Sequence, residues 1–330
     1  MSAGVGPRVS VVVPTYNRAE SLSRLLDAIA RSKMPDGGLE VVVVDDGSSD
    51  PTPEVAAQAG VRYLRQTNCG PAAARDRGWR AASGEVIVFF DDDVVPAPDT
   101  IYKLVKGVDS ADACGAMIRP LNDTSMFAQY MHLDGMINHR VVDGQVVWLV
   151  LLATAVRREA LERIGGFDLT FHPAGEDVDM TSRLSEAGCA LRVDPTAVAR
   201  TRCASSFWQL FRTLYVYGGG FRMLASRHTG FRRERTRSAF LRLHPTEWRN
   251  VYRHYRREAS RRRTLFFLLL HAVVVLPYGL GVIVGQRAVG RPERARDVHV
   301  AVDGAQVELI GHRHETASVG TLVEETELAS

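Results

Sequence analysis

The chain has 330 residues, 45% of them hydrophobic and 24% charged, which is the balance of a folded protein with one large domain or two ordinary ones. Its formal net charge of +3 gives no indication of a nucleic-acid-binding protein. Four widely spaced cysteines show neither metal-ligand nor paired spacing, and no apolar signal segment precedes the first expected strand. These features argue against a disulfide framework and favour a cytoplasmic location.

Short apolar runs alternate with helical patterns over the first part of the chain. The expected strands lie at 9–13, 40–44, 61–65 and 85–90. Between them, Asn17 and Glu20 have the spacing of a capping box, and Pro71 opens another helix. Repeated strand–helix units predict an α/β fold with a Rossmann-like, mostly parallel sheet flanked by helices. Ligands of such sheets bind at the carboxyl ends of the strands.

Three consecutive aspartates, Asp91, Asp92 and Asp93, follow the fourth expected strand. Adjacent carboxylates raise one another's pKa, and a divalent cation relieves that repulsion. Mg²⁺ and Mn²⁺ are held by one or two carboxylates together with substrate phosphates, so the cluster predicts a metal bridging the chain to a diphosphate. A solvated acidic turn is the plain alternative. An aspartyl-phosphate phosphatase is a further one, but Lys103 and Lys106, the only lysines after the cluster, lie on the very next helix.

A second acidic pair, Asp45 and Asp46, follows four valines. A dinucleotide fold would need glycines in the first strand-to-helix turn so that pyrophosphate can approach the backbone. Residues 14–18 read Pro-Thr-Tyr-Asn-Arg instead, which argues against NAD binding. A carboxylate at this strand end can still accept hydrogen bonds from a base or ribose.

Six segments resemble, in order, those of family 2 glycosyltransferases. They are residues 9–18, the acidic segment ending at Asp50, residues 68–75, Gly84-Glu85 leading to Asp91–Asp93, residues 164–168 and residues 175–177. The resemblance covers about Val9 to Thr201. It implies a GT-A fold and an inverting transfer of a sugar from a nucleoside diphosphate sugar, with UDP favoured by family analogy.

The resemblance also implies roles for individual residues. Nucleotide-sugar binding falls to Pro14, Thr15, Tyr16, Asp46, Arg75, Asp91 and Asp92, with Asp46 facing the base and Asp92 the ribose. Asp93, the last residue of the DXD motif, would bind a divalent metal, Mg²⁺ or Mn²⁺. Asp177, with Glu176 beside it, would be the general base that deprotonates the acceptor hydroxyl. The two acids open a helix, whose dipole stabilises a carboxylate, and simple helix N-terminal acids are the alternative reading.

One departure from the family concerns the metal. Many relatives carry a His shortly after the strand that follows this helix, whereas residues 199–203 read Ala-Arg-Thr-Arg-Cys. Either Arg200 or Arg202 then meets the diphosphate, or Asp93 holds the metal largely alone. The missing His also motivates a second hypothesis, a non-catalytic nucleotide-sugar-binding or scaffold protein on the same fold.

The C-terminal part is basic and then apolar. Between Arg227 and Arg263 there are thirteen Arg against three Glu, and residues 265–285 carry no formal charge. That length reaches the roughly 20 residues of a membrane span, although Pro277 and three glycines weaken the case, and an in-plane helix hairpin or a buried helix are alternatives. Membrane contact through 264–285, at the cytoplasmic face, would favour a lipid-linked acceptor over a carbohydrate or small molecule.

These patterns predict a domain organisation. We expect a GT-A catalytic domain over residues 1–204, with its nucleotide-binding half at about 1–110 and its acceptor half at about 111–204. A basic and apolar helical extension would follow at 205–296, and a polar tail at 297–330.

Overall fold

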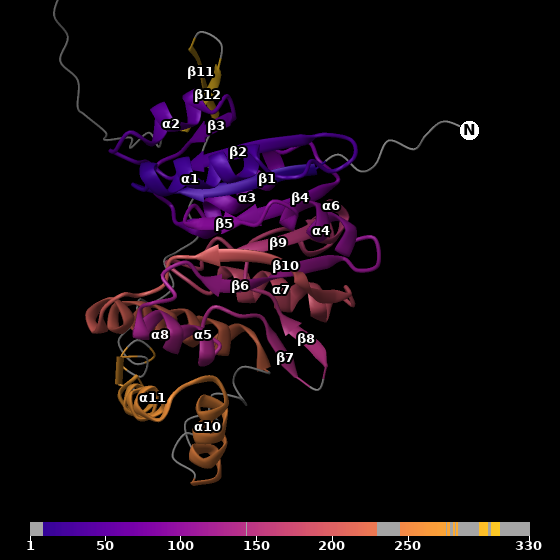
Figure 1. Ribbon diagram of the computed structural model, residues 1–330. Coiled ribbons are helices and arrows are strands. Elements are labelled where there is room, and N and C mark those ends of the chain that lie inside the picture. The colour runs from indigo at the N-terminus through magenta and orange to yellow at the C-terminus, as the bar shows by residue number, and fades with distance from the viewer. Residues whose placement is uncertain are drawn as a thin grey trace, which may run out of the picture.

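The computed structural model describes residues 9–142, 144–229, 245–274, 276–277, 280, 282, 297–302 and 305–310. Its main sheet has ten strands in the order β11-β12-β3-β2-β1-β4-β9-β6-β10-β5, and β7 and β8 form a separate hairpin. Helices cover this sheet, which runs through the middle of the molecule in Figure 1. The expected α/β fold with a mostly parallel sheet is confirmed.

The first half of the molecule consists of parallel strand–helix units. Its elements are β1 (Val9–Thr15), α1 (Ala19–Ala30), β2 (Leu39–Asp45), α2 (Thr52–Gln58), β3 (Arg62–Arg65), α3 (Pro71–Ala81) and β4 (Val86–Phe90). β1 lies between β2 and β4, with Val11 opposite both Val41 and Val88. All seven residues of β1 are buried, as a run of β-branched residues inside a parallel sheet should be.

Helix α3 lies unusually close to the sheet at Gly78. A Cβ atom added there would stand 2.4 Å from Cγ1 of Val12 and 3.1 Å from Cγ2 of Val44. The absence of a side chain therefore lets α3 approach β1 and β2. This approach sets the depth at which Arg75, one turn earlier on the same helix, sits beneath the strand ends.

The start of α1 corrects the sequence prediction. Asn17 is not the helix cap, because it adopts a left-handed conformation with φ of 53° and Arg18 occupies the cap position without a capping hydrogen bond from its side chain. The amide nitrogen of Ala19 donates instead to Asp50 Oδ2 at 2.9 Å. Asn17 Oδ1 accepts from the backbone of Ser49 at 2.7 Å. The capping is thus supplied by the loop after β2, which the local sequence around α1 does not reveal.

The second half adds strands of mixed direction. Its elements are β5 (Val94–Pro96), α4 (Thr100–Gly107), β6 (Ala113–Pro120), α5 (Met126–Leu133), β7 (Arg140–Val142), β8 (Gln145–Trp148), β9 (Ala153–Arg157), α6 (Arg158–Ile164), α7 (Glu176–Glu186) and β10 (Leu191–Thr201). β9 runs antiparallel between β4 and β6. β10 pairs parallel with β6, with an irregularity in the register between Asp194 and Val198.

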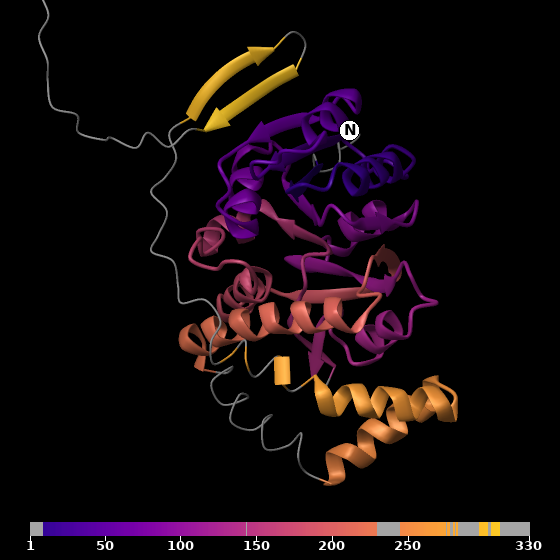
Figure 2. The same cartoon turned by 90° about the vertical axis from the view of Figure 1, so that its left-hand side faces the viewer.

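The C-terminal elements are α8 (Phe207–Arg227), α10 (Pro245–Glu258), α11 (Arg261–Val273), β11 (Asp297–Val302) and β12 (Ala305–Ile310). The α10–α11 pair lies at the end of the molecule opposite α2 and β3 (Figures 1 and 2). Within the described residues, no helix combines the length and the apolar composition needed to cross a membrane. Residues 275, 278–279, 281 and 283–285 of the expected 265–285 segment lie outside the described residues, as does most of the expected 297–330 tail.

Candidate active site

The carboxyl ends of β1, β2 and β4 and the start of α7 open onto one cavity of about 1680 Å³. All the residues expected at the site line it, namely Pro14, Thr15, Tyr16, Asp46, Arg75, Asp91, Asp92, Asp93, Glu176 and Asp177. The expected metal ligand Asp93 and the expected base Asp177 are therefore in a common cleft. A single bound substrate can contact both Asp93 and Asp177 only if the two carboxylates share a cleft.

The acidic cluster after β4 is held by neighbouring side chains. Thr15 Oγ1 donates to Asp92 Oδ2 at 2.9 Å, and Thr201 Oγ1, at the end of β10, donates to Asp93 Oδ1 at 3.1 Å. Arg18 Nη1 lies 2.7 Å from Asp93 Oδ2 and 3.4 Å from Asp92 Oδ1. Burial raises the pKa of Asp92 to about 7 although Arg18 opposes the shift. Burial and the carboxylate of Asp91 likewise raise the pKa of Asp93, so this corner of the cavity favours a cation.

A buried arginine connects the acidic cluster to the expected base. Arg75, only 5% exposed, lies between β4 and α7. Its Nη2 is 2.5 Å from Asp91 Oδ1, and its Nη1 forms an ion pair with Glu176. Burial by itself lowers the pKa of Arg75, but Asp91, Glu176 and Asp177 raise it overall. This bridge, Asp91–Arg75–Glu176, fixes α7 relative to the end of β4.

The pair Glu176 and Asp177 occupies the first turn of α7. Burial raises the pKa of both carboxyl groups, and Arg75 limits the rise. Among the described residues, Asp177 Oδ1 accepts only a local hydrogen bond, from the backbone nitrogen of Val178 at 2.8 Å. Glu176 is committed to Arg75, whereas Asp177 keeps carboxylate oxygens available to a ligand in the cavity.

Asp46 is held by the loop before α3. Its Oδ1 accepts hydrogen bonds from Gln66 Nε2 and the Cys69 backbone, and its Oδ2 accepts from the Gly70 backbone, each at 2.8 Å. Burial raises the pKa of Asp46 despite these donors. The carboxylate thus shapes the end of the cavity below β1 and β2 through the loop, and Tyr16, 47% exposed, also lines the cavity.

Three residues of the cavity or its acidic cluster were not singled out from the sequence as site residues. Arg18 follows directly on Asn17 in the first strand-to-helix turn, so its place in a recognisable motif was a usable signal. Thr201 contacts Asp93 in the segment where many relatives carry a His. Tyr217 comes from α8, keeps 39% of its surface exposed, and has its pKa raised by burial and by the nearby carboxylate of Asp177. No short motif marks it.

The close packing of α8 on α7 brings Tyr217 into the cavity. A Cβ atom at Gly220 would lie 2.7 Å from the carbonyl oxygen of Ala174, and one at Gly175 would lie 3.3 Å from Gly220 Cα. Two glycines therefore allow α8 to cross against the start of α7. The wall of the cavity that α8 forms beside Asp177 depends on this crossing.

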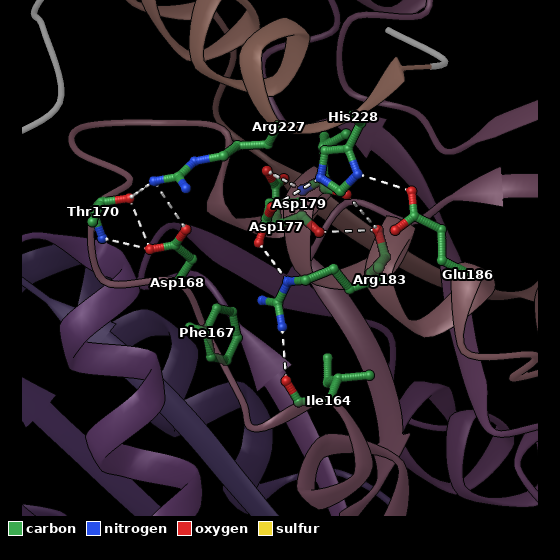
Figure 3. A network of polar contacts seen from close by, with 12 residues as sticks. Ile164, Phe167, Asp168, Thr170, Asp177, Asp179, Arg183, Glu186, Arg227 and His228 are labelled. Carbon is green, nitrogen blue, oxygen red and sulfur yellow. Dashed lines mark hydrogen bonds and ion pairs between the residues drawn. The ribbon is translucent and has the colours of Figure 1, made fainter.

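A polar network anchors the rest of α7 (Figure 3). His228, just after α8, contacts Asp179 Oδ1 through Nε2 and Glu186 Oε1 through Nδ1, both at 2.9 Å. Arg183 Nε lies 2.8 Å from Asp179 Oδ2 and its Nη1 donates to the carbonyl of Ile164 at 3.1 Å. Burial lowers the pKa of His228, but its two carboxylate partners raise it overall. The network therefore ties both ends of α7 to the end of α8.

The carboxylates of the cavity suit a metal ion that takes only some of its ligands from the protein. Among the described residues, no group of three or more His, Cys, Asp or Glu side chains is arranged to hold an ion. Mg²⁺ and Mn²⁺ commonly take one or two protein carboxylates and complete their shell with phosphates and water. Asp93, partly buried beside like charges and, within the described part of the chain, paired with Arg18 and Thr201, fits that role. Arg200 points elsewhere, with Nη1 at 3.9 Å from Asp123.

Comparison with known sequences gives a consistent assignment. The model of the family described as glycosyl transferase family 2 matches residues 10–165. The chain is 31% identical over 235 residues to the pre-mycofactocin glycosyltransferase of Mycobacterium tuberculosis, covering 67% of this chain and 48% of that protein. It is 30% identical over 225 residues to the glycosyltransferase AglE of Haloferax volcanii, covering 65% of this chain and 73% of that protein. The chain thus spans about half the length of the mycobacterial relative.

Solved structures share the fold. A mannosyltransferase from Pyrobaculum calidifontis, PcManGT, in complex with GDP-Man and Mn²⁺, superposes with a TM-score of 0.55 at 24% identity over 85% of this chain and 84% of that one. S. aureus TarS residues 1–349 superpose with a TM-score of 0.51 at 18% identity, over 91% and 95% of the two chains. With its GT-A fold, its family model match and its similarity to AglE, the chain belongs to glycosyl transferase family 2.

Proposed function

We propose that this protein transfers a sugar from a nucleoside diphosphate sugar to an acceptor hydroxyl with inversion at the anomeric carbon. The observation that carries the proposal is the common cavity of Asp93 and Asp177, joined through Asp91, Arg75 and Glu176. Inversion needs one base on the acceptor and a stabilised leaving diphosphate, with no covalent intermediate. In one half of the cavity Asp177 would supply the base, and in the other Asp93 with a bound metal would stabilise the diphosphate.

The donor nucleotide would occupy the end of the cavity formed by the first strands. Pro14, Thr15 and Tyr16 would line the base, Asp46 would face it, and Asp92 would meet the ribose. Arg75 and Asp91 would lie beside the diphosphate. UDP is the nucleotide we favour by family analogy, while the structure of PcManGT contains GDP-Man.

A divalent metal, Mg²⁺ or Mn²⁺, would be held by Asp93. When bound, such an ion neutralises the charge that develops on the leaving diphosphate. Arg18 contacts the same carboxylate and is free to turn toward the diphosphate when a cation takes its place, since its side chain is 52% exposed. Thr201 would keep Asp93 oriented through its hydrogen bond.

Asp177 would act as the general base on the acceptor. Its raised pKa makes it a stronger proton acceptor than an exposed aspartate, and the nearby charge of Arg75 limits the rise. Glu176 would be a positioning residue that holds Arg75. The acceptor, whether carbohydrate, lipid-linked or small molecule, would enter on the side of β7, β8 and α8.

Domain limits and location belong to the same proposal. A catalytic domain over 1–204, with halves divided at about residue 110, a helical extension over 205–296 and a tail over 297–330 stay predictions. So do the cytoplasmic location and the membrane contact through 264–285.

The test is release of nucleoside diphosphate by the purified chain from a panel of nucleotide sugars with Mn²⁺ and acceptor candidates. Asp177→Asn should lower the turnover by about 10²- to 10⁴-fold while donor binding persists. Glu20→Gln, the same change of charge at the exposed start of α1, is the matched control and should leave turnover unchanged.

Other outcomes separate the alternatives. Donor binding without turnover of any donor would favour the non-catalytic scaffold. Phosphoryl transfer to Asp91 that is indifferent to Asp177→Asn would favour the phosphatase. A failure to bind any nucleotide sugar would contradict the proposed function itself.

A further inference from the structure

Helix α11 is apolar on two opposite faces. Thr264, Phe267 and Leu270 are buried, and the ring of Phe267 packs against Tyr130 of α5 and Tyr255 of α10. On the other side, Leu265 is 66% exposed and Leu269 is 62% exposed. A surface helix of a globular protein normally presents polar residues opposite its buried stripe. The outward leucines therefore have no role in the packing of the described residues.

Five of the exposed residues of α11 form one stripe. Leu265, Leu269 and Ala272 follow at spacings of four and three residues, and Arg261 and Arg262 precede Leu265 and Leu269 by four and seven. We call these five residues the outer face of α11. Beyond the helix, Leu276 is again 66% exposed. The outer face thus begins with two cations and continues as a row of apolar side chains.

Helix α10, which packs on α11 through Tyr255 and Phe267, carries further cations. Arg249, Arg253 and Arg257 recur every four residues and are exposed. Neither these three nor Arg261 and Arg262 have any ion-pair or hydrogen-bond partner within the described part of the chain. Arg263 only reaches Gln129, at 3.4 Å. Five exposed guanidinium groups without carboxylates call for an anionic partner.

We propose that the outer face of α11 lies in the plane of an anionic phospholipid bilayer. The leucines would enter the boundary between headgroups and acyl chains, and the arginines would contact lipid phosphates while their stems lie along the apolar surface. As described, α11 has 13 residues, fewer than the roughly 20 of a spanning helix, and this length suits a helix that lies in the plane of the bilayer. A second copy of the chain is a poorer occupant, because the same arginines would face one another across a symmetric contact.

This placement gives the cleft an orientation. Val251 of α10, together with His271 and Val274 at the end of α11, lines the cavity that contains Asp177. The α10–α11 pair would therefore hold the acceptor side of the cleft near the bilayer surface. That last step rests on the proposed function, whereas the docking itself does not.

The experiment is co-sedimentation of the full chain with phosphatidylcholine vesicles, with and without phosphatidylglycerol, at low and high NaCl. Wild type should sediment with the phosphatidylglycerol vesicles and be released by salt. Leu265→Ser with Leu269→Ser should weaken the partition by about tenfold for each leucine. Arg261→Gln with Arg262→Gln should weaken it by about fivefold for each arginine. Met34→Ser, a 49% exposed apolar residue after α1, is the matched control and should bind as wild type does.

Circular dichroism and nucleotide binding show that each variant is folded, independently of any sugar transfer. Wild type that stays in solution with all vesicles would overturn the proposal, as would leucine variants that sediment like wild type. So would concentration-dependent dimerisation without vesicles that the leucine variants abolish, because the outer face would then be a contact between copies. Wild type that binds the vesicles but turns over no nucleotide sugar would contradict the proposed function and leave the docking supported.

Discussion

Replacing Arg75 with methionine tests the bridge on which the site depends. The change removes the cation shared by Asp91 and Glu176 while keeping a side chain of similar length. Removing one partner of a buried ion pair costs about 3–5 kcal/mol, because the remaining charge is left unpaired. That loss is a large share of the roughly 5–15 kcal/mol that stabilises a typical protein. Arg80→Met, on the same helix but 49% exposed at its side chain, should cost less than about 1 kcal/mol.

The loss should also depend on pH. Burial already raises the pKa of Glu176 and Asp177 above the ordinary carboxyl values, and removing Arg75 should raise them further in the folded state. A carboxyl group whose folded pKa exceeds its unfolded pKa binds its proton more tightly in the native state. Stability therefore falls as the pH rises from the unfolded pKa to the folded pKa. The deficit of Arg75→Met relative to wild type should be small near about pH 4 and grow toward neutrality.

Urea unfolding at several pH values, followed by circular dichroism, measures both effects. Adding Glu176→Gln to Arg75→Met should recover part of the lost free energy of unfolding at neutral pH, because one of the unpaired charges is gone. An Arg75→Met variant as stable as Arg80→Met would refute the reasoning. A loss that does not change with pH would also do so, since it would come from packing alone.

Three further predictions address other parts of the molecule. Arg18→Gln frees Asp93 from an exposed guanidinium and should raise the affinity for Mn²⁺ without nucleotide by about two- to fivefold in isothermal titration calorimetry; an unchanged affinity would mean that Arg18 and the cation do not compete. His228→Leu should cost more stability at a pH below about 6.5, the ordinary pKa of histidine, than at alkaline pH. The raised pKa of His228 gives a stabilisation that is lost as the pH rises through the pKa of the folded state. Equal losses in thermal unfolding at both pH values would contradict this. Gly78→Ala gains about 1 kcal/mol of helix propensity, but overpacking against Val12 costs about 1–3 kcal/mol, so urea unfolding should show a less stable variant. A more stable variant would show that α3 can move away from the sheet.

Local sequence patterns predicted the first half of the fold well. The valine runs at 9–13 and 41–44 are buried parallel strands because β-branched residues with no polar alternation suit a sheet covered on both faces. The start of α1 was predicted wrongly for a physical reason. Its first amide is capped by Asp50, 31 residues away, and a pattern of neighbouring residues cannot report a partner at that separation.

Strand direction and site contacts were harder to predict than strand existence. Nothing in the composition of β9 distinguishes an antiparallel strand placed between β4 and β6 from a parallel one. Similarly, Asp91 to Asp93 and Glu176–Asp177 could be listed from the sequence as separate acidic groups. Their meeting depends on Arg75, on the close approach of α3 at Gly78 and on the crossing of α8 at Gly220. These are tertiary contacts, and each involves residues that look ordinary in the chain.

The position of Arg75 explains why the two acidic groups can share a cavity at all. Asp91, Glu176 and Asp177 converge from β4 and α7, and their mutual repulsion would drive these elements apart unless a positive charge lay between them. On the proposed function, a divalent metal would leave and return with each diphosphate, so it would not hold these elements together permanently. A guanidinium on α3, itself buried and held by the packing of its helix on β1 and β2, holds the end of β4 and the start of α7 together as a permanent part of the chain. Arg75 therefore preorganises the cavity, and on the proposed function a divalent cation would be left to the partly exposed corner where Arg18 and Asp93 meet.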